Sequence, residues 1–116
     1  MGRMSRAKGS RGELEFARLA RTYGFDCERT GRDGRTSEDV THNIEGAHLE
    51  IKRDERLSVD AMVRQAERDA QPGRVPVVAY RRNRQPWRVV VPAEEWLRLK
   101  ALERALYPGS ALREAA

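Results

Sequence analysis

The sequence contains few cysteines and histidines, the residues that most often form cross-links and metal sites. It has one cysteine, Cys27, and two histidines in 116 residues. One cysteine cannot form an internal disulfide, and no Cys/His spacing typical of zinc ligands is present, so a disulfide scaffold and a zinc finger are excluded. We expect a reducing, cytoplasmic environment, in which Cys27 is a small core residue.

Long apolar runs are also missing. No stretch approaches the roughly 18 apolar residues that a membrane-spanning helix requires. The N-terminal sequence MGRMSRAKGSRG is basic, and no apolar segment follows it as in a signal peptide. We therefore expect no association with a membrane.

The chain instead has an excess of positive charge. Its formal net charge is +5 and its pI is about 10.0, mostly because of arginine. The planar guanidinium group binds phosphate oxygens in pairs, so a nucleic-acid partner is favoured. The alternative is a solvated arginine-rich surface with no specific partner.

The length fits one domain, and we expect three segments. Residues 1–11 are predicted as a basic flexible arm, 12–107 as the folded domain and 108–116 as a fraying C-terminal tail. Arg3, Arg6 and Lys8 of the arm are placed to contact phosphates.

Hydrophobic periodicity predicts the order α-β-β-β-α-β-β-α. The expected helices span 12–23, 58–71 (capped by Ser58) and 92–107 (begun by Pro92), and the expected strands span 25–29, 39–44, 47–52, 75–80 and 87–91. This order predicts an α/β fold in which helices flank one mixed five-stranded sheet.

An acidic group follows from the third expected strand. Residues two apart on a strand point to the same face, so Glu50 and Lys52 lie together while Ile51 points into the core. Asp39 begins the preceding strand, and a hairpin can bring its carboxylate to Glu50. Carboxylates from different elements can hold a hard divalent cation, and a lysine beside them can orient water or offset charge. A solvated strand face is the alternative explanation of Glu50 and Lys52.

The first helix offers a third carboxylate. At about 100° per residue, Glu13 projects on the side of Phe16 and Ala20, whereas Glu15 lies on the polar face near Arg18. Glu13 is therefore the better candidate to face the site. The simpler explanation is that Glu13 only complements the positive end of the helix.

Other polar and aromatic residues are ambiguous. His42 and His48 are expected at the surface or in structural roles, although His48 shares the face of Glu50. Trp87 and Trp96 are expected as core or interface anchors. The remaining cases, equally open between an ordinary exposed residue and a functional one, are Gln65 and the basic turn with Arg81, Arg82 and Arg84.

Over residues 8–52 the chain resembles the archaeal-type Holliday junction resolvases of the PD-(D/E)XK nuclease superfamily. The matching residues, in order, are Lys8-Gly9, Glu13, Gly24-Phe25, Arg29, Asp39-Val40 and Glu50-Ile51-Lys52. One departure is that Glu38 stands where the family has proline before the aspartate. Proline bears no chemistry there, so this difference is tolerable.

The resemblance implies a restriction-endonuclease-like core, Mg²⁺-dependent cleavage (with Mn²⁺ able to substitute) and a homodimer that nicks opposed strands of a four-way DNA junction. It implies that Asp39, Glu50 and Glu13 bind the metal and that Lys52 is the catalytic lysine. The residues expected to contact DNA are Arg11, Arg29, Lys8, Arg6 and Arg35, with Thr36 or Ser37 supplying a functional hydroxyl.

Two alternatives to a junction resolvase remain at this point. One is a PD-(D/E)XK nuclease that acts on another DNA substrate in nicking, restriction or repair. The other is a non-catalytic nucleic-acid-binding module, which would not need Asp39, Glu50 and Lys52. A resolvase of this size would work in the cytoplasm of a prokaryotic cell or of a phage-infected host.

Overall fold

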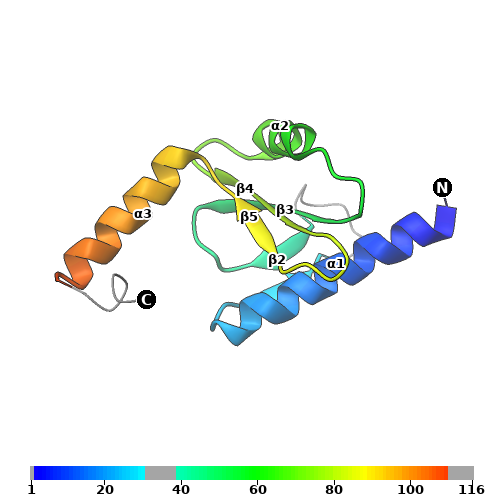
Figure 1. Ribbon diagram of the computed structural model, residues 1–116, viewed down its shortest axis with the longest axis horizontal. Helices are drawn as coiled ribbons and strands as arrows, with labels where there is room; N and C mark the ends of the chain where they lie inside the picture. The colour runs from blue at the N-terminus through cyan, green and yellow to red at the C-terminus, as the bar shows by residue number, and fades with distance from the viewer. Residues whose placement is uncertain (1, 31–38, 110–116) are drawn as a thin grey trace.

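The predicted order of helices and strands is confirmed in the computed structural model (Figure 1), which describes residues 2–30 and 39–109 and, within them, the side chains from residue 11 onward. The elements are α1 (Gly2–Thr22), β1 (Cys27–Arg29), β2 (Val40–His42), β3 (Ala47–Arg53), α2 (Val59–Asp69), β4 (Val75–Arg81), β5 (Arg88–Val90) and α3 (Ala93–Leu106).

The strands form two sheets, so the prediction of a single five-stranded sheet is wrong. β3, β4 and β5 form a mixed sheet in that order, with β3 parallel to β4 and β4 antiparallel to β5. β1 and β2 form a separate antiparallel pair of three residues each. The physical reason lies at the outer edge of β3. There the Asp39 carboxylate accepts a hydrogen bond from the backbone N–H of Ile51 at 2.8 Å. A side chain therefore fills a position that a neighbouring strand would otherwise use.

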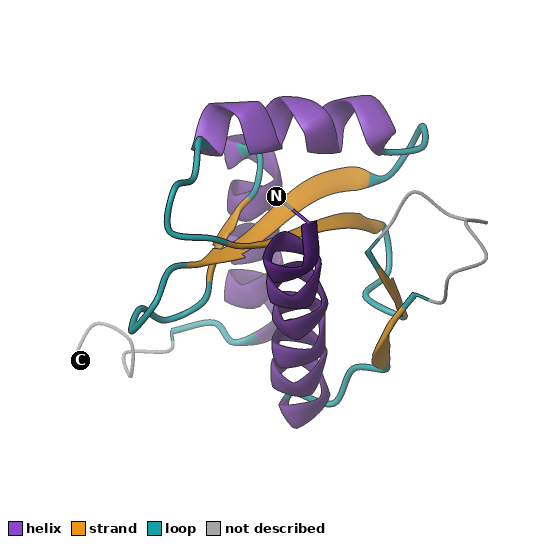
Figure 2. Ribbon diagram, turned by 90° about the vertical axis from the view of Figure 1, so that its right-hand side faces the viewer, coloured by secondary structure: helices purple, strands orange, loops and turns teal. Residues whose placement is uncertain are grey.

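The three-stranded sheet lies between two helices (Figure 2), with α2 over one face and α1 over the other. Phe16 and Ala17 of α1 pack in one cluster with Leu49 and Ile51 of β3. On the opposite face Met62 and Ala66 of α2 pack on Val78. β3 is thus covered on both sides, and α2 carries the crossover between the parallel strands β3 and β4.

Helix α1 begins earlier than predicted. It starts at Gly2 and not at Gly12, so it includes most of the segment expected to be a flexible arm. The predicted role of residues 1–11 in phosphate contact stays a prediction. The predicted end of the helix is confirmed, because Gly24 adopts a φ of 89°, a conformation that other residues rarely take.

The predicted cap of α2 is also confirmed. Ser58 accepts a hydrogen bond from the N–H of Ala61 through its hydroxyl oxygen at 3.3 Å. Pro92 precedes the first residue of α3 and does not itself begin the helix. Within the described residues, none of the helices combines the length and the apolarity needed to cross a bilayer.

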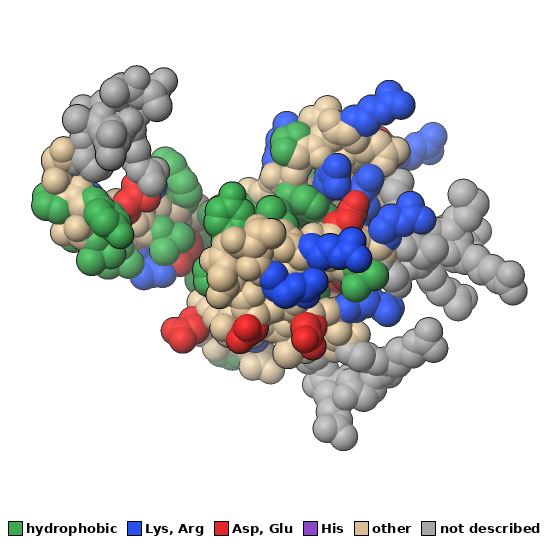
Figure 3. All heavy atoms as spheres, turned by 90° about the horizontal axis from the view of Figure 1, so that it is seen from below, with side chains coloured by type: hydrophobic (Ala, Val, Ile, Leu, Met, Phe, Trp, Pro, Cys, Tyr) green, Lys and Arg blue, Asp and Glu red, His purple; other side chains and the backbone are tan. Residues whose placement is uncertain are grey.

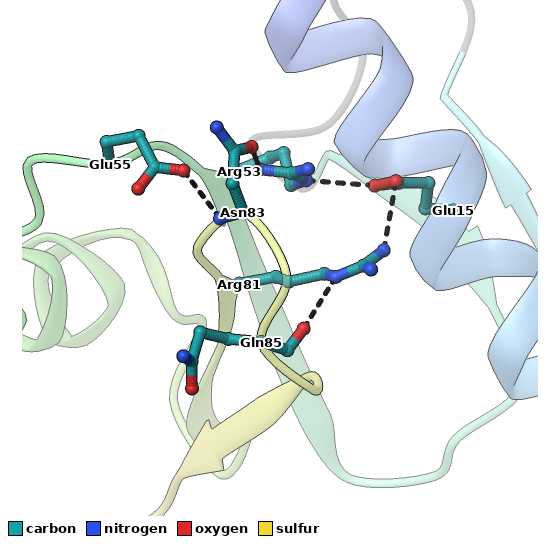
Figure 4. A network of polar contacts seen from close by, with 6 residues as sticks. All are labelled: Glu15, Arg53, Glu55, Arg81, Asn83 and Gln85. Carbon is teal, nitrogen blue, oxygen red and sulfur yellow. Dashed lines mark hydrogen bonds and ion pairs between the residues drawn. The ribbon is translucent and has the colours of Figure 1, made fainter.

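Glu15 anchors α1 to the sheet through an arginine network (Figure 4). Its carboxylate accepts hydrogen bonds from Arg53 of β3 and Arg81 of β4, each at 3.1 Å. Arg53 also donates to Asn83 Oδ1 at 2.7 Å, and Arg81 donates to the carbonyl of Gln85 at 2.8 Å. The network therefore ties α1 to the ends of two strands and to the turn between β4 and β5.

A glycine permits the close approach of α1 to β3. A Cβ atom on Gly12 would lie 2.6 Å from the Cβ of Arg53, which is too close for two carbon atoms. Because Arg53 Cβ is next to the backbone, it cannot swing away as the end of a long side chain could. The absence of a side chain at Gly12 thus sets the distance between α1 and β3.

We expect Gly12→Ala to destabilise the protein, although alanine is favoured over glycine within helices by about 1 kcal/mol. Relieving the contact requires a backbone shift of the kind that costs about 1–3 kcal/mol, and it disturbs Arg53. Thermal unfolding should show a lower Tm for this variant. Arg18→Ala, on the exposed face of the same helix, serves as the control and should change Tm little. A Tm for Gly12→Ala equal to or above that of the wild type would contradict the close approach.

Candidate metal centre

Strand β3 brings three polar side chains to one face. His48, Glu50 and Lys52 alternate with Leu49 and Ile51, as the sequence pattern predicts. His48 is 1% exposed and Glu50 is 2% exposed. Of the two positions expected for His48, at the surface or in a structural role, the surface position is excluded. Its Nε2 lies 3.1 Å from Glu50 Oε1, so the imidazole is hydrogen-bonded to one of the two carboxylate oxygens.

Asp39 reaches the same region from the residue before β2. Its Oδ2 atom accepts the hydrogen bond from Ile51 N–H, which fixes the carboxylate beside the centre of β3. The charge of Asp39 interacts with those of Lys52 and His48. The expected meeting of Asp39 with the Glu50 strand is therefore present, although the two segments do not pair as a hairpin.

Glu13 contributes a third carboxylate from α1. Asp39 raises its pKa and Lys52 lowers it, so both charged groups lie within electrostatic range of Glu13. Its Oε2 atom accepts a hydrogen bond from Arg29 Nε of β1 at 2.8 Å. Glu15, the other candidate on α1, is instead held by Arg53 and Arg81. The role of Glu13 at a metal site stays a prediction.

All three carboxylates are shifted toward the protonated form. Burial raises the pKa of Glu13, and the nearby Asp39 adds to the rise, although Arg29 opposes it. Burial also raises the pKa of Asp39 against the opposing effects of the Ile51 N–H and Lys52. Burial raises the pKa of Glu50 as well, with His48 opposing and the charge of Asp39 adding to the rise. Removal of carboxylates from water next to one another is unfavourable unless a cation compensates.

Glu13, Asp39 and Glu50 carry oxygen donors of the type that a hard divalent cation such as Mg²⁺ takes, but among the described residues the donor atoms found within 4.8 Å of one another are those of His48, Glu50 and Asp69. Mg²⁺ prefers a few carboxylate oxygens and keeps several waters, which suits a site of three carboxylates from different elements. Lys52 supplies a positive charge beside them.

A second donor group overlaps the first at Glu50. One donor atom from each of His48, Glu50 and Asp69 lies within 4.8 Å of the others. Imidazole favours Mn²⁺ and other transition ions over Mg²⁺, so this mixed group has a different preference. Asp69, the last residue of α2, was not predicted as a site residue. Its position just before Gln71-Pro72-Gly73 at the end of a helix was the only signal for it in the sequence.

The predicted DNA-contacting residues are only partly described. Arg29 forms an ion pair with Glu13. Arg11 is exposed on α1. Arg6 and Lys8 lie in α1, but their side chains are outside the described residues, as are Arg35, Thr36 and Ser37. Whether Thr36 or Ser37 supplies a hydroxyl stays a prediction.

The ambiguous residues now have positions. Trp87 is partly buried against the core and meets Phe16 edge-on, with ring centroids 5.5 Å apart. Arg81 belongs to the Glu15 network, and the Arg82 guanidinium lies 5.6 Å from the ring centre of Tyr80. Gln65 is half-buried on α2, and this position gives it no evident role.

Comparison with other proteins gives no further assignment. No protein-family model matches the chain, and no curated protein matches it.

We expect Asp39→Asn to raise the stability of the metal-free protein at pH 8. The folded-state pKa of Asp39 is raised, so the wild type loses stability as pH rises from the unfolded-state pKa through the folded-state pKa. Asparagine keeps an oxygen that can accept from Ile51 N–H but removes the buried charge. Thermal unfolding without metal should show a Tm a few degrees above the wild type at pH 8 and no gain at pH 3.

Glu15→Gln makes the same change of charge where the carboxylate has two arginine partners, and it should lower Tm at pH 8. A Tm for Asp39→Asn below the wild type at pH 8, as for Glu15→Gln, would contradict an uncompensated charge at Asp39.

Proposed function

We propose that the protein is a metal-dependent DNA endonuclease of the PD-(D/E)XK type that resolves four-way junctions. The observation that carries the proposal is the buried Glu50 carboxylate on β3 with the Asp39 side chain bonded to the adjacent Ile51 N–H. Glu13 and Lys52 lie within electrostatic range of Asp39. A solvated strand face does not explain them, because Glu50 is buried and the charge of Asp39 raises the pKa of both Glu13 and Glu50. A binding module would gain nothing from that unfavourable arrangement.

We propose Mg²⁺ as the resident ion, with Glu13, Asp39 and Glu50 as the carboxylates that would hold it. Bound there, Mg²⁺ would offset charge on a phosphodiester and favour deprotonation of a nearby water. The Lys52 ammonium group, on the face of Glu50, is placed to orient an attacking water or to offset charge on phosphate oxygens. Arg29, held by Glu13, is placed to bind a neighbouring phosphate. His48 Nε2 lies 3.1 Å from Oε1 of Glu50 and is placed to orient that carboxylate.

The choice of substrate rests on the resemblance over residues 8–52 and on charge. A net charge of +5 favours a polyanion. A restriction-endonuclease-like core is consistent with the position of the acidic residues on and beside β3 and with the crossover through α2. A two-fold homodimer suits a junction, because it presents two identical sites to opposed strands.

We expect Asp39→Asn and Glu50→Gln to lower Mg²⁺-dependent cleavage of a synthetic four-way junction by at least about 100-fold, the scale for loss of a group that acts in the transition state. Binding to the junction, measured in Ca²⁺ or EDTA, should stay within a few-fold of wild type. Glu45→Gln, an exposed carboxylate in the turn before β3, is the matched control and should cleave normally. Full activity of either site variant would end the assignment.

The same assay separates the alternatives when flap, single-stranded and linear duplex DNA are included. Preference for the junction supports resolution. Equal cleavage of linear duplex would indicate a nuclease of the same class with another substrate. Binding without any cleavage in Mg²⁺ or Mn²⁺ would indicate a non-catalytic module.

The two donor groups can be distinguished by metal binding alone. We expect Mg²⁺ to raise the Tm of the wild type, because a ligand that binds only the folded state stabilises it. Asp39→Asn should abolish this rise and His48→Asn should retain most of it. The opposite pattern would place the ion between His48, Glu50 and Asp69, and the same titration with Mn²⁺ would then give the larger rise.

A further inference from the structure

The turn between β4 and β5 is a basic segment to which the candidate metal centre gives no role. It consists of residues 82–85, and the N–H of Gln85 donates to the carbonyl of Arg82 at 3.1 Å to close it. Arg84 at the tip is exposed, and Arg82 is half-buried. Among the residues that the structure describes, neither arginine forms an ion pair. We call Arg82 and Arg84 the turn arginines.

The acidic residues around the turn do not pair with the turn arginines, because they have other partners. The carboxylate of Glu15 accepts from both Arg53 and Arg81. The carboxylate of Glu55 accepts from the backbone N–H of Asn83 at 2.5 Å (Figure 4). The positive charges of the turn arginines are therefore available to a partner outside the chain.

Arg84 holds a backbone conformation that arginine rarely adopts. Its φ is 62°, and within the described residues every other positive φ belongs to a glycine. A different residue stays in this conformation only where its surroundings hold it there. Here Arg53 donates to Asn83 Oδ1 at 2.7 Å, and Arg81 donates to the carbonyl of Gln85 at 2.8 Å. Glycine would fit the position without strain, so the arginine indicates a role for its side chain outside the fold.

The turn lies at the same end of the sheet as Lys52. In the parallel register of β3 and β4, Lys52 is opposite Tyr80, so the two side chains share one face on strands about 4.8 Å apart. Arg82 follows Tyr80 by two residues, and its guanidinium lies over the Tyr80 ring, 5.6 Å from the ring centre. The charge of Arg82 is therefore on the face of the sheet that carries Glu50 and Lys52, one strand further across.

A nucleic acid fits this surface better than an anionic membrane does. Guanidinium groups bind phosphate oxygens in pairs, which suits a phosphodiester backbone. Attachment to a membrane surface also needs exposed apolar side chains, and within the described residues 39–88 no large hydrophobic residue is exposed. Figure 3 shows Lys and Arg side chains gathered over the body of the protein, whereas α3 shows mostly hydrophobic ones. A nucleic-acid strand that reaches the acidic centre would thus lie close to the turn.

We propose that the turn arginines bind the DNA backbone beside the phosphate that is cleaved and so position the substrate. Arg82, next to Lys52, contacts the nearer phosphate, and Arg84 at the tip contacts one farther along the strand. Such contacts fix the register of a protein on DNA without reading its sequence. The inference rests on the proposed function for the identity of the partner, but it does not depend on cleavage.

Arg84→Gly tests the strained position on its own and stays informative if the double variant described below misfolds. Glycine adopts the left-handed conformation readily, so Tm should be equal to or above that of the wild type. Binding to a labelled synthetic four-way junction in EDTA should nevertheless weaken, and its dependence on salt should fall by about one phosphate contact. Wild-type affinity and salt dependence in Arg84→Gly would overturn the proposal.

The double variant Arg82→Gln with Arg84→Gln tests both contacts in the same assay. Each phosphate contact contributes about 0.9 to the slope of log K against log salt, so the slope should fall by about 2 and binding should weaken by at least about 10-fold. The matched control, Arg64→Gln with Arg104→Gln, removes two exposed arginine charges from α2 and α3 and should change the slope and the affinity little. An unchanged slope in the turn variant, or an equal loss in the control, would overturn the proposal.

The same measurements separate this inference from the proposed function. Junction binding that depends on the turn arginines, in a protein that does not cleave, would support the inference and contradict the nuclease. Cleavage by a protein whose binding does not depend on the turn arginines would do the reverse, and a wild type that binds no junction would overturn both. Cosedimentation with vesicles of phosphatidylserine and phosphatidylcholine that the double variant loses, with junction binding unchanged, would assign the turn to a membrane surface and overturn the inference.

Discussion

The candidate site depends on one constraint, the burial of the Glu50 carboxylate on a strand that is covered on both faces. β3 turns Leu49 and Ile51 toward α1 and turns His48 and Glu50 toward the other layer, where water is excluded. Burial raises the pKa of Glu50, and the arrival of Asp39 beside it adds to that cost. The buried, neighbouring carboxylates lower the stability of the metal-free fold. A bound cation would offset this electrostatic cost.

The position of α1 brings Glu13 within electrostatic range of Asp39 and Lys52, and other residues determine that position. Glu15 is clamped by arginines from β3 and β4, and Gly12 lets the helix approach Arg53 closely (Figure 4). Glu13, on the neighbouring face of the same helix, is thereby directed toward Asp39 and Lys52. Two glutamates separated by one residue thus have different functions, one in anchoring the helix and one at the acidic centre.

Local pattern was enough to predict the order of the elements, the cap at Ser58, the helix end at Gly24 and the shared face of Glu50 and Lys52. Contacts between distant segments were not predictable in this way. Glu15 was expected on the polar face of its helix near Arg18. It pairs instead with Arg53 and Arg81, which are on later strands. The five-stranded sheet failed because a side chain of Asp39 occupies the edge of β3. Asp69 was missed for a related reason, since its proximity to His48 and Glu50 depends on how α2 crosses β3.

The central claim is that this acidic centre cuts DNA at a branch point. The most direct test is to map, at nucleotide resolution, the cuts that the protein makes in a mobile four-way junction with Mg²⁺. The account predicts paired nicks at symmetric positions on two opposed strands, no cuts when EDTA replaces the metal, and none from Glu50→Gln. Intact strands with Mg²⁺ and with Mn²⁺, in a sample shown to bind the junction, would contradict it.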